Sequence, residues 1–98
     1  MSRWIYRLVP TRPEMLGAPT LEEQTVMAEH VDYLEALTAA GILVLAGRPE
    51  HDHGAPGITI FEAPDEASAR AVTQTDPAVA AGVMTAELYP YAVAVNGD

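Results

Sequence analysis

The chain has 98 residues, of which 49% are hydrophobic, and this length predicts a single domain over residues 1–98 with a modest core. It contains no cysteine, which excludes disulfides, thiolate chemistry and zinc sites built on sulfur. Fourteen acidic residues against five arginines give a net charge of −9, which argues against a nucleic-acid partner. The longest apolar run, Ile42 to Ala46, is far too short to span a bilayer, so we expect a soluble cytoplasmic protein without a membrane partner.

The first predicted elements are a strand and a long helix. Aromatic and branched side chains from Arg3 to Val9 indicate the strand. Thr20 and Glu23 have the spacing of a capping box at the start of the helix, and Gly41 is a natural end for it. Apolar residues recur at helical spacing and predict the buried face of this helix: Leu21, Met27, Val31, Leu34 and Leu37.

The rest of the chain predicts three further strands and a second helix. The run from Ile42 to Gly47 is short and branched, which is typical of a buried strand, and Ile58 to Ala63 forms the next one. Pro64 to Thr75 indicates the second helix. Met84 to Val95 alternates like a strand, although Pro90 within it requires an edge position or a bulge.

The element order βαββαβ predicts the fold class. It is typical of an α+β, ferredoxin-like domain, in which an antiparallel sheet carries both helices on one face. The other face would then be bare, although the first and last strands carry apolar side chains on both sides. A soluble monomer rarely exposes an apolar patch of that size, so we predict a homodimer that packs sheet against sheet.

His30 is the first candidate for chemistry. It lies three residues after Met27 and four before Leu34, which places it on the core-facing side of the first helix. A buried imidazole needs a hydrogen-bond partner. That partner could be a backbone carbonyl, in which case His30 is structural, or a carboxylate, in which case it could exchange protons.

Asp76 is the second candidate, and it too has a structural explanation. An aspartate followed by Pro77 is a common helix start, and the proline biases Asp76 away from helical geometry, which would end the second helix at Thr75. A rigid turn of this kind can also hold a carboxylate in a pocket. Taken alone, the local pattern favours the structural role, and that role does not exclude a functional one.

Four further side chains could contact a small-molecule substrate. Arg7 and Arg48 are scarce positive charges that could orient an anion, although Arg48 suits a loop surface. Tyr6 and Tyr33 could contribute a phenol, and Tyr33 follows His30 by three residues. We predict Arg7, Tyr6 and Tyr33 as substrate-binding residues.

We predict no metal and no cofactor. His51 and His53 are spaced to reach one ion from an extended segment, but they lie in a loop rich in glycine and proline, and no third ligand is evident. Exposed loop histidines explain the pair better. The sequence contains no glycine-rich phosphate loop, nucleophile elbow or HExxH motif.

The stretch EHVDYLEALTAAGILVLAGR, followed by FEAPDEASARAVTQTDPAVAAGVM and LYPYAV, resembles the YciI-like family, also called the YCII-related domain, over nearly the whole chain. The residues that carry the resemblance are His30, Gly41, Gly47, Glu62, Asp76, Pro77, Gly82 and Pro90. The resemblance implies a ferredoxin-like fold that dimerises into an α+β barrel, with a small pocket in each subunit and a histidine–aspartate pair at its centre. Carried over, that pair is His30 and Asp76. Ala78 departs from the family, where a bulky aromatic residue often follows the Asp-Pro pair.

These observations lead to one main function and three alternatives. The main prediction is a small dimeric enzyme of the lyase or isomerase type, with His30 as acid and base and Asp76 orienting it. Its substrate would be a small carbonyl or phenolic metabolite. The alternatives are a non-catalytic module that binds a small molecule, a cofactor-free monooxygenase of the related dimeric α+β barrel group, and a purely structural dimerisation domain.

Overall fold

A computed structural model describes residues 2–49 and 57–95, so His51 and His53 lie outside the described residues. The predicted order βαββαβ is confirmed, and two short helices are added to it. The elements are β1 (Ser2–Pro10), η1 (Pro13–Leu16), α1 (Leu21–Ala39), β2 (Leu43–Gly47), β3 (Gly57–Ala63), α2 (Glu66–Thr75), α3 (Pro77–Ala80) and β4 (Met84–Tyr91).

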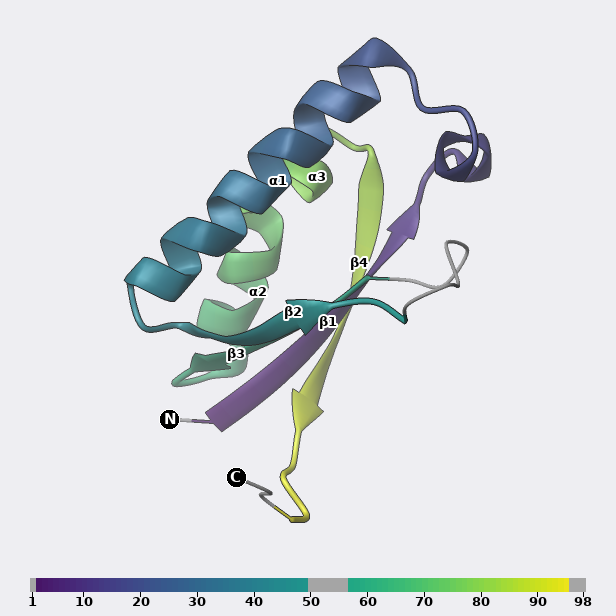
Figure 1. Ribbon diagram of the computed structural model, residues 1–98. Coiled ribbons are helices and arrows are strands. Elements are labelled where there is room, and N and C mark those ends of the chain that lie inside the picture. Colours follow the sequence, from purple (N-terminus) through teal and green to yellow (C-terminus); the bar gives the residue numbers. More distant parts are fainter. Residues whose placement is uncertain (1, 50–56, 96–98) are drawn as a thin grey trace.

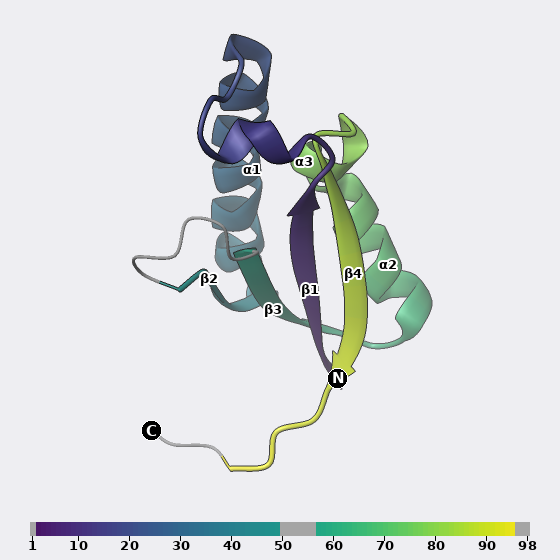
Figure 2. The ribbon, with the colours of Figure 1, turned by 90° about the vertical axis from the view of Figure 1, so that its right-hand side faces the viewer.

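The four strands form one antiparallel sheet in the order β2-β3-β1-β4. α1 and α2 lie on the same side of this sheet (Figure 1), and the opposite side is seen in Figure 2. The α+β, ferredoxin-like architecture is therefore as predicted. β1 occupies a central position, because it pairs with β3 on one side and with β4 on the other.

The core lies between the helices and the sheet. Tyr6 on β1 and Phe61 on β3 are fully buried, and their rings meet edge to face with centroids 5.7 Å apart. Such aromatic pairs contribute about 0.5–1.5 kcal/mol beyond the area they bury. The other buried members of this core are Trp4, Leu8, Met15, Val26, Ala63, Ala69, Ala78 and Met84.

α1 begins and ends where its sequence signals indicate, but its buried face is turned from the predicted one. The Thr20 hydroxyl accepts from the Glu23 backbone N–H at 3.1 Å, and the Glu23 carboxylate accepts from the Thr20 N–H at 2.8 Å. Gly41 has a φ of 75°, which glycine adopts without strain. Leu21 and Val31 were predicted to be buried, and this is wrong, because they are 81% and 50% exposed. The helix instead points a face containing Glu23, Val26, His30 and Leu37 at the sheet.

The prediction of a buried strand at Ile42 to Gly47 is also wrong in one respect. β2 is an edge strand of the sheet, and its residues Val44 and Leu45 are 42% and 64% exposed. Its register shifts between Leu43 and Leu45. A continuous apolar run cannot distinguish a central strand that is covered on both faces from an edge strand that is exposed on one face.

β4 is shorter than predicted, ending at Tyr91 rather than Val95. The ladder between β1 and β4 runs from Arg3 paired with Tyr91 to Pro10 paired with Met84. Pro90 lies on this edge strand, as its missing N–H requires.

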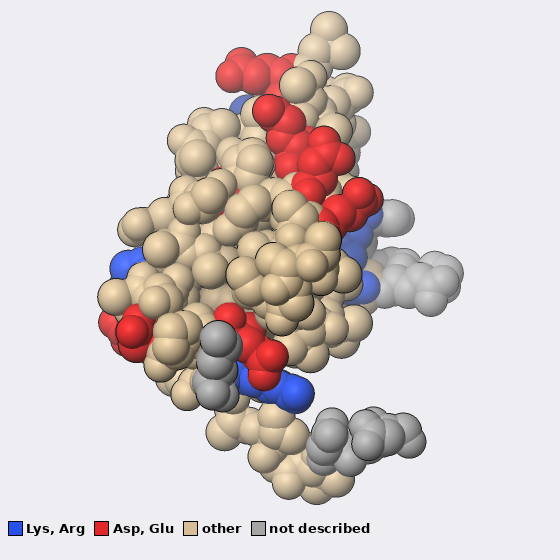
Figure 3. All heavy atoms as spheres, turned by 90° about the vertical axis from the view of Figure 1, so that its left-hand side faces the viewer, with Lys and Arg blue, Asp and Glu red and all other residues tan. Residues whose placement is uncertain are grey.

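The two surfaces of the molecule differ in character. Figure 3 views the helix side, where carboxylates outnumber arginines; α1 carries the exposed acids Glu22, Glu29, Asp32 and Glu35. The uncovered face of the sheet instead exposes apolar and aromatic side chains, including Leu45, Tyr89 and Tyr91. In the part of the chain that the structure describes, no helix has the length and apolar character needed to cross a membrane.

Candidate functional site

His30 and Asp76 lie in contact beneath α1. The imidazole Nδ1 is 2.8 Å from Oδ2 and 2.9 Å from Oδ1 of the carboxylate, although the two residues are 46 positions apart in the chain. Asp76 is fully buried, and His30 is 8% exposed. Because a carboxylate can only accept, the imidazole donates through Nδ1, and Nε2 lies on the opposite side of the ring.

The local sequence explains why Asp76 is held so rigidly. Its backbone is not helical, with φ −57° and ψ 124°, so α2 ends at Thr75 and α3 begins at Pro77. Its Oδ1 accepts from the backbone N–H of Ala78 at 2.9 Å. Asp76 is therefore the N-cap of α3 and the partner of His30 at the same time, so the two explanations of this residue are compatible.

Tyr6 completes the surroundings of the carboxylate. Its hydroxyl donates to Asp76 Oδ2 at 2.8 Å, across 70 positions of sequence. Burial, followed by the negative charge of Asp76, raises the pKa of the Tyr6 phenol, while the side chain of Thr59 acts in the opposite direction. The phenol is therefore a permanent donor, and together with the Ala78 N–H it fixes the carboxylate that orients His30.

The three residues predicted to bind substrate, Tyr6, Tyr33 and Arg7, lie away from the cavity beside His30. Tyr6 is fully buried behind Asp76 and cannot touch a ligand. The Tyr33 hydroxyl donates to the Val72 carbonyl at 2.6 Å and ties α1 to α2, and burial with the charge of Asp76 raises its pKa to about 12. Side chains alternate between the two faces along β1, and this places Arg7 on the uncovered face of the sheet. There its Nε lies 3.1 Å from Oε1 of Glu87. None of the three is among the described residues that line the cavity beside His30.

A cavity of about 530 Å³ lies beside His30, between α1, η1 and the ends of all four strands. This volume is in the usual range for small-molecule sites. Its described lining is mostly apolar: Leu8, Pro10, Met15, Leu16, Pro19, Glu23, Gln24, Met27, His30, Val31, Leu34, Ala46, Gly47, Arg48, Gly57, Ile58, Thr59 and Met84. Among the described residues no hydrogen bond uses His30 Nε2, so this nitrogen is available to a ligand.

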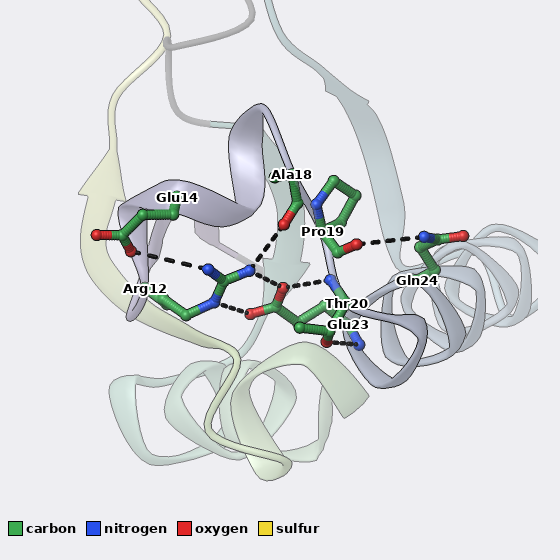
Figure 4. A network of polar contacts seen from close by, with 7 residues as sticks. All are labelled: Arg12, Glu14, Ala18, Pro19, Thr20, Glu23 and Gln24. Carbon is green, nitrogen blue, oxygen red and sulfur yellow. Dashed lines mark hydrogen bonds and ion pairs between the residues drawn. The ribbon is translucent and has the colours of Figure 1, made fainter.

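One wall of the cavity is held by an ion pair that sequence reasoning missed (Figure 4). The Arg12 guanidinium donates to Glu23 through Nε at 2.9 Å and through Nη2 at 2.6 Å, and Nη2 also donates to the Ala18 carbonyl. Because Glu23 also accepts from the Thr20 N–H, its carboxylate is fully engaged. Glu23 is thus a structural brace and not a general base. The capping-box spacing revealed its helical role, but nothing local indicated Arg12.

This brace predicts an acid-sensitive contribution to stability. The hydrogen bonds from Arg12, then that from Thr20, lower the pKa of Glu23 from 4.5 to about 2. Because the folded pKa is depressed, the stabilisation is complete above 4.5 and is lost as the pH falls toward 2. In Glu23→Gln, which keeps a capping-box amide but no charge, thermal midpoints should fall less steeply over this interval than in the wild type. Parallel curves for the two proteins would contradict the assignment.

Metal ligation receives no support from the described residues. In residues 2–49 and 57–95, no group of three or more histidine, aspartate or glutamate side chains is placed to hold an ion. The histidines that first suggested a metal, His51 and His53, lie outside these ranges.

Comparison with known proteins adds a family and a fold relative. A family model described as the YCII-related domain matches residues 4–91. Among solved structures, the chain is similar to the 5-chloro-2-hydroxyhydroquinone dehydrochlorinase (TftG) from Burkholderia phenoliruptrix AC1100, in complex with 2,5-dihydroxybenzoquinone. The TM-score is 0.67, the sequence identity is 23%, and the match covers 94% of each chain, so the likeness shows a shared fold. No curated protein sequence matches the chain.

Proposed function

The chain belongs to the YCII-related domain family, and from this premise we propose that it is a small dimeric enzyme in which His30 transfers protons. One observation carries the proposal. The imidazole is bound through Nδ1 to a fully buried carboxylate, while the same ring lines a cavity of ligand size. The reactions that suit such a pair are isomerisation and elimination on a small carbonyl or phenolic compound.

The chemistry would proceed by a single proton shuttle. His30 Nε2 takes a proton from a hydroxyl, or from a carbon next to a carbonyl, and Asp76 stabilises the imidazolium that forms. The electron pair left behind becomes a new double bond. In an elimination, this electron pair expels a leaving group with its bonding electrons, and the imidazolium then gives its proton to that group or to solvent. In an isomerisation, the imidazolium returns the proton to another atom of the substrate. A general acid–base group of this kind typically contributes about 10²–10⁴-fold in rate.

The fold relative supports an elimination. That protein is named as a dehydrochlorinase, which implies loss of HCl, and its structure holds a dihydroxybenzoquinone. In this chain the cavity next to His30 is mainly apolar, which suits a ring of similar polarity. We therefore expect halogenated or hydroxylated cyclic carbonyl compounds to be the best first substrates.

A screen of such compounds tests the proposal. Ultraviolet spectra and halide release should reveal turnover by the wild type that the His30→Ala variant lacks. Binding that survives His30→Ala, with no product from any compound, would favour the non-catalytic binding module instead. Consumption of oxygen with quinol substrates would favour the cofactor-free monooxygenase.

The uncovered face of the sheet supports the proposed homodimer. Ile5, Leu45, Ile60 and Tyr91 surround a shallow hollow on this face, and Leu45 and Tyr91 are exposed. An exposed apolar surface of this kind usually packs against a partner. A second copy of the chain would satisfy it, as the family resemblance implies.

Sedimentation velocity at micromolar concentration should therefore give a dimer for the wild type and a monomer for Leu45→Glu. A buried glutamate at the interface would carry an uncompensated desolvation cost. Leu21→Glu is the control, because Leu21 is also exposed but lies on α1, on the helix side of the molecule. A wild-type monomer, or a Leu45→Glu dimer, would rule out this interface.

A further inference from the structure

The cavity beside His30 has an unusual concentration of methionine. Three of the four methionines of the chain line it, and each comes from a different element: Met15 from η1, Met27 from α1 and Met84 from β4. Met15 and Met84 are 6% and 8% exposed, so the protein holds them in place. Flexible thioethers that converge from three elements form a wall that adapts to the shape of a ligand.

Apart from the His30 imidazole, the described lining offers these sulfurs no aromatic ring. The single Trp, the single Phe and the four Tyr residues are all described, and none of them lines the cavity. Thioether sulfur interacts favourably with the edge of an aromatic ring. An aromatic ligand would therefore gain contacts that a saturated ligand of the same size would not.

The volume of the cavity limits how large an aromatic ligand can be. A cavity of about 150 Å³ is sufficient for benzene. The cavity here, at about 530 Å³, thus has room for a substituted single ring or for two fused rings. Its polar groups lie at positions suited to one ring substituent, because two of them line the cavity: His30, which is bonded to Asp76, and Thr59, which pairs with Tyr6 across the sheet.

We propose that Met15, Met27 and Met84 are specificity residues that select a planar aromatic ring carrying a hydroxyl group directed at His30. This inference rests on the proposed function only in taking the His30 cavity as the substrate site. The Arg12–Glu23 brace supports it, because Arg12 directly precedes η1 and its guanidinium fastens that segment, with Met15, to α1.

The experiment compares two probes that share a carbon skeleton and a hydroxyl group but differ in aromaticity. Isothermal titration calorimetry measures binding of 2-naphthol and of its saturated analogue, decahydro-2-naphthol. The variants Met15→Leu, Met27→Leu and Met84→Leu keep the side-chain volume and remove the sulfur. Each should weaken 2-naphthol binding by about 2- to 10-fold and leave binding of the saturated analogue unchanged. The control is Leu37→Met, an exchange of the same kind at a buried site outside the lining, which should change neither.

Methionine methyl signals give a second readout. In protein labelled with ¹³C at the methionine methyl group, 2-naphthol should shift the signals of Met15, Met27 and Met84 by its ring current, whereas the saturated analogue should not. Equal affinity for the two probes, or variants that weaken both alike, would overturn the inference. Binding needs no turnover, so an inactive wild type that still prefers 2-naphthol would refute the proposed catalysis and leave this selectivity standing.

Discussion

Replacing His30 with Asn should lower the rate of the proposed proton transfer by about 10²–10⁴-fold and leave the fold intact. The asparagine amide can place a nitrogen donor near the position of Nδ1 and so keep the hydrogen bond to Asp76, now 2.8 Å long. It offers nothing in place of Nε2, which is the atom that takes the proton. The variant therefore separates the chemical role of His30 from its structural role.

The measurement is the turnover number on the best compound from the screen, with circular dichroism to verify the fold. Glu29→Gln is the matched control, because Glu29 neighbours His30 on α1 but is exposed to solvent. It should react at the wild-type rate. If the His30→Asn variant also retains the full rate, His30 is a structural histidine and the proposed mechanism fails.

Asp76→Ala should be the most destabilising single substitution in the site, at about 3–5 kcal/mol of unfolding free energy. Three buried donors would lose their acceptor together: the Tyr6 hydroxyl, the His30 Nδ1–H and the Ala78 N–H. A loss of this size is a large part of the 5–15 kcal/mol that stabilises a typical domain. Urea denaturation followed by circular dichroism measures it.

The chain supplies a matched control for this experiment. Asp65 is the N-cap of α2 and accepts from the Ser68 N–H at 2.7 Å, but its side chain is exposed and, among the described residues, bonds to no other element. Asp65→Ala should therefore cost only about 1 kcal/mol, the usual effect of losing a cap. If Asp76→Ala costs no more than Asp65→Ala, then Asp76 acts as a cap alone and its contacts with Tyr6 and His30 contribute little.

The sequence by itself determined the element order and most of the helix ends. The capping box of Thr20 and Glu23, the positive φ of Gly41 and the Asp76-Pro77 boundary all lie where their spacing indicated. These signals are readable because each acts within a few residues, through backbone hydrogen bonds and steric limits that need no tertiary partner.

The pairing of His30 with Asp76 came from the family resemblance, because no local rule connects residues 46 positions apart. Only the tertiary structure decided the role of Tyr6, which turned from an expected substrate contact into a donor that holds Asp76. It also decided that Arg7 lies on the uncovered face and that Arg12 braces Glu23.

The sequence also could not determine that Met15, Met27 and Met84 line one cavity, or that β2 is an edge strand. Apolar periodicity reports that a side chain is buried, but not what buries it. The neighbours that bury a side chain are determined by the rotation of α1 over the sheet and by the order of the strands. Both depend on how all the elements pack together.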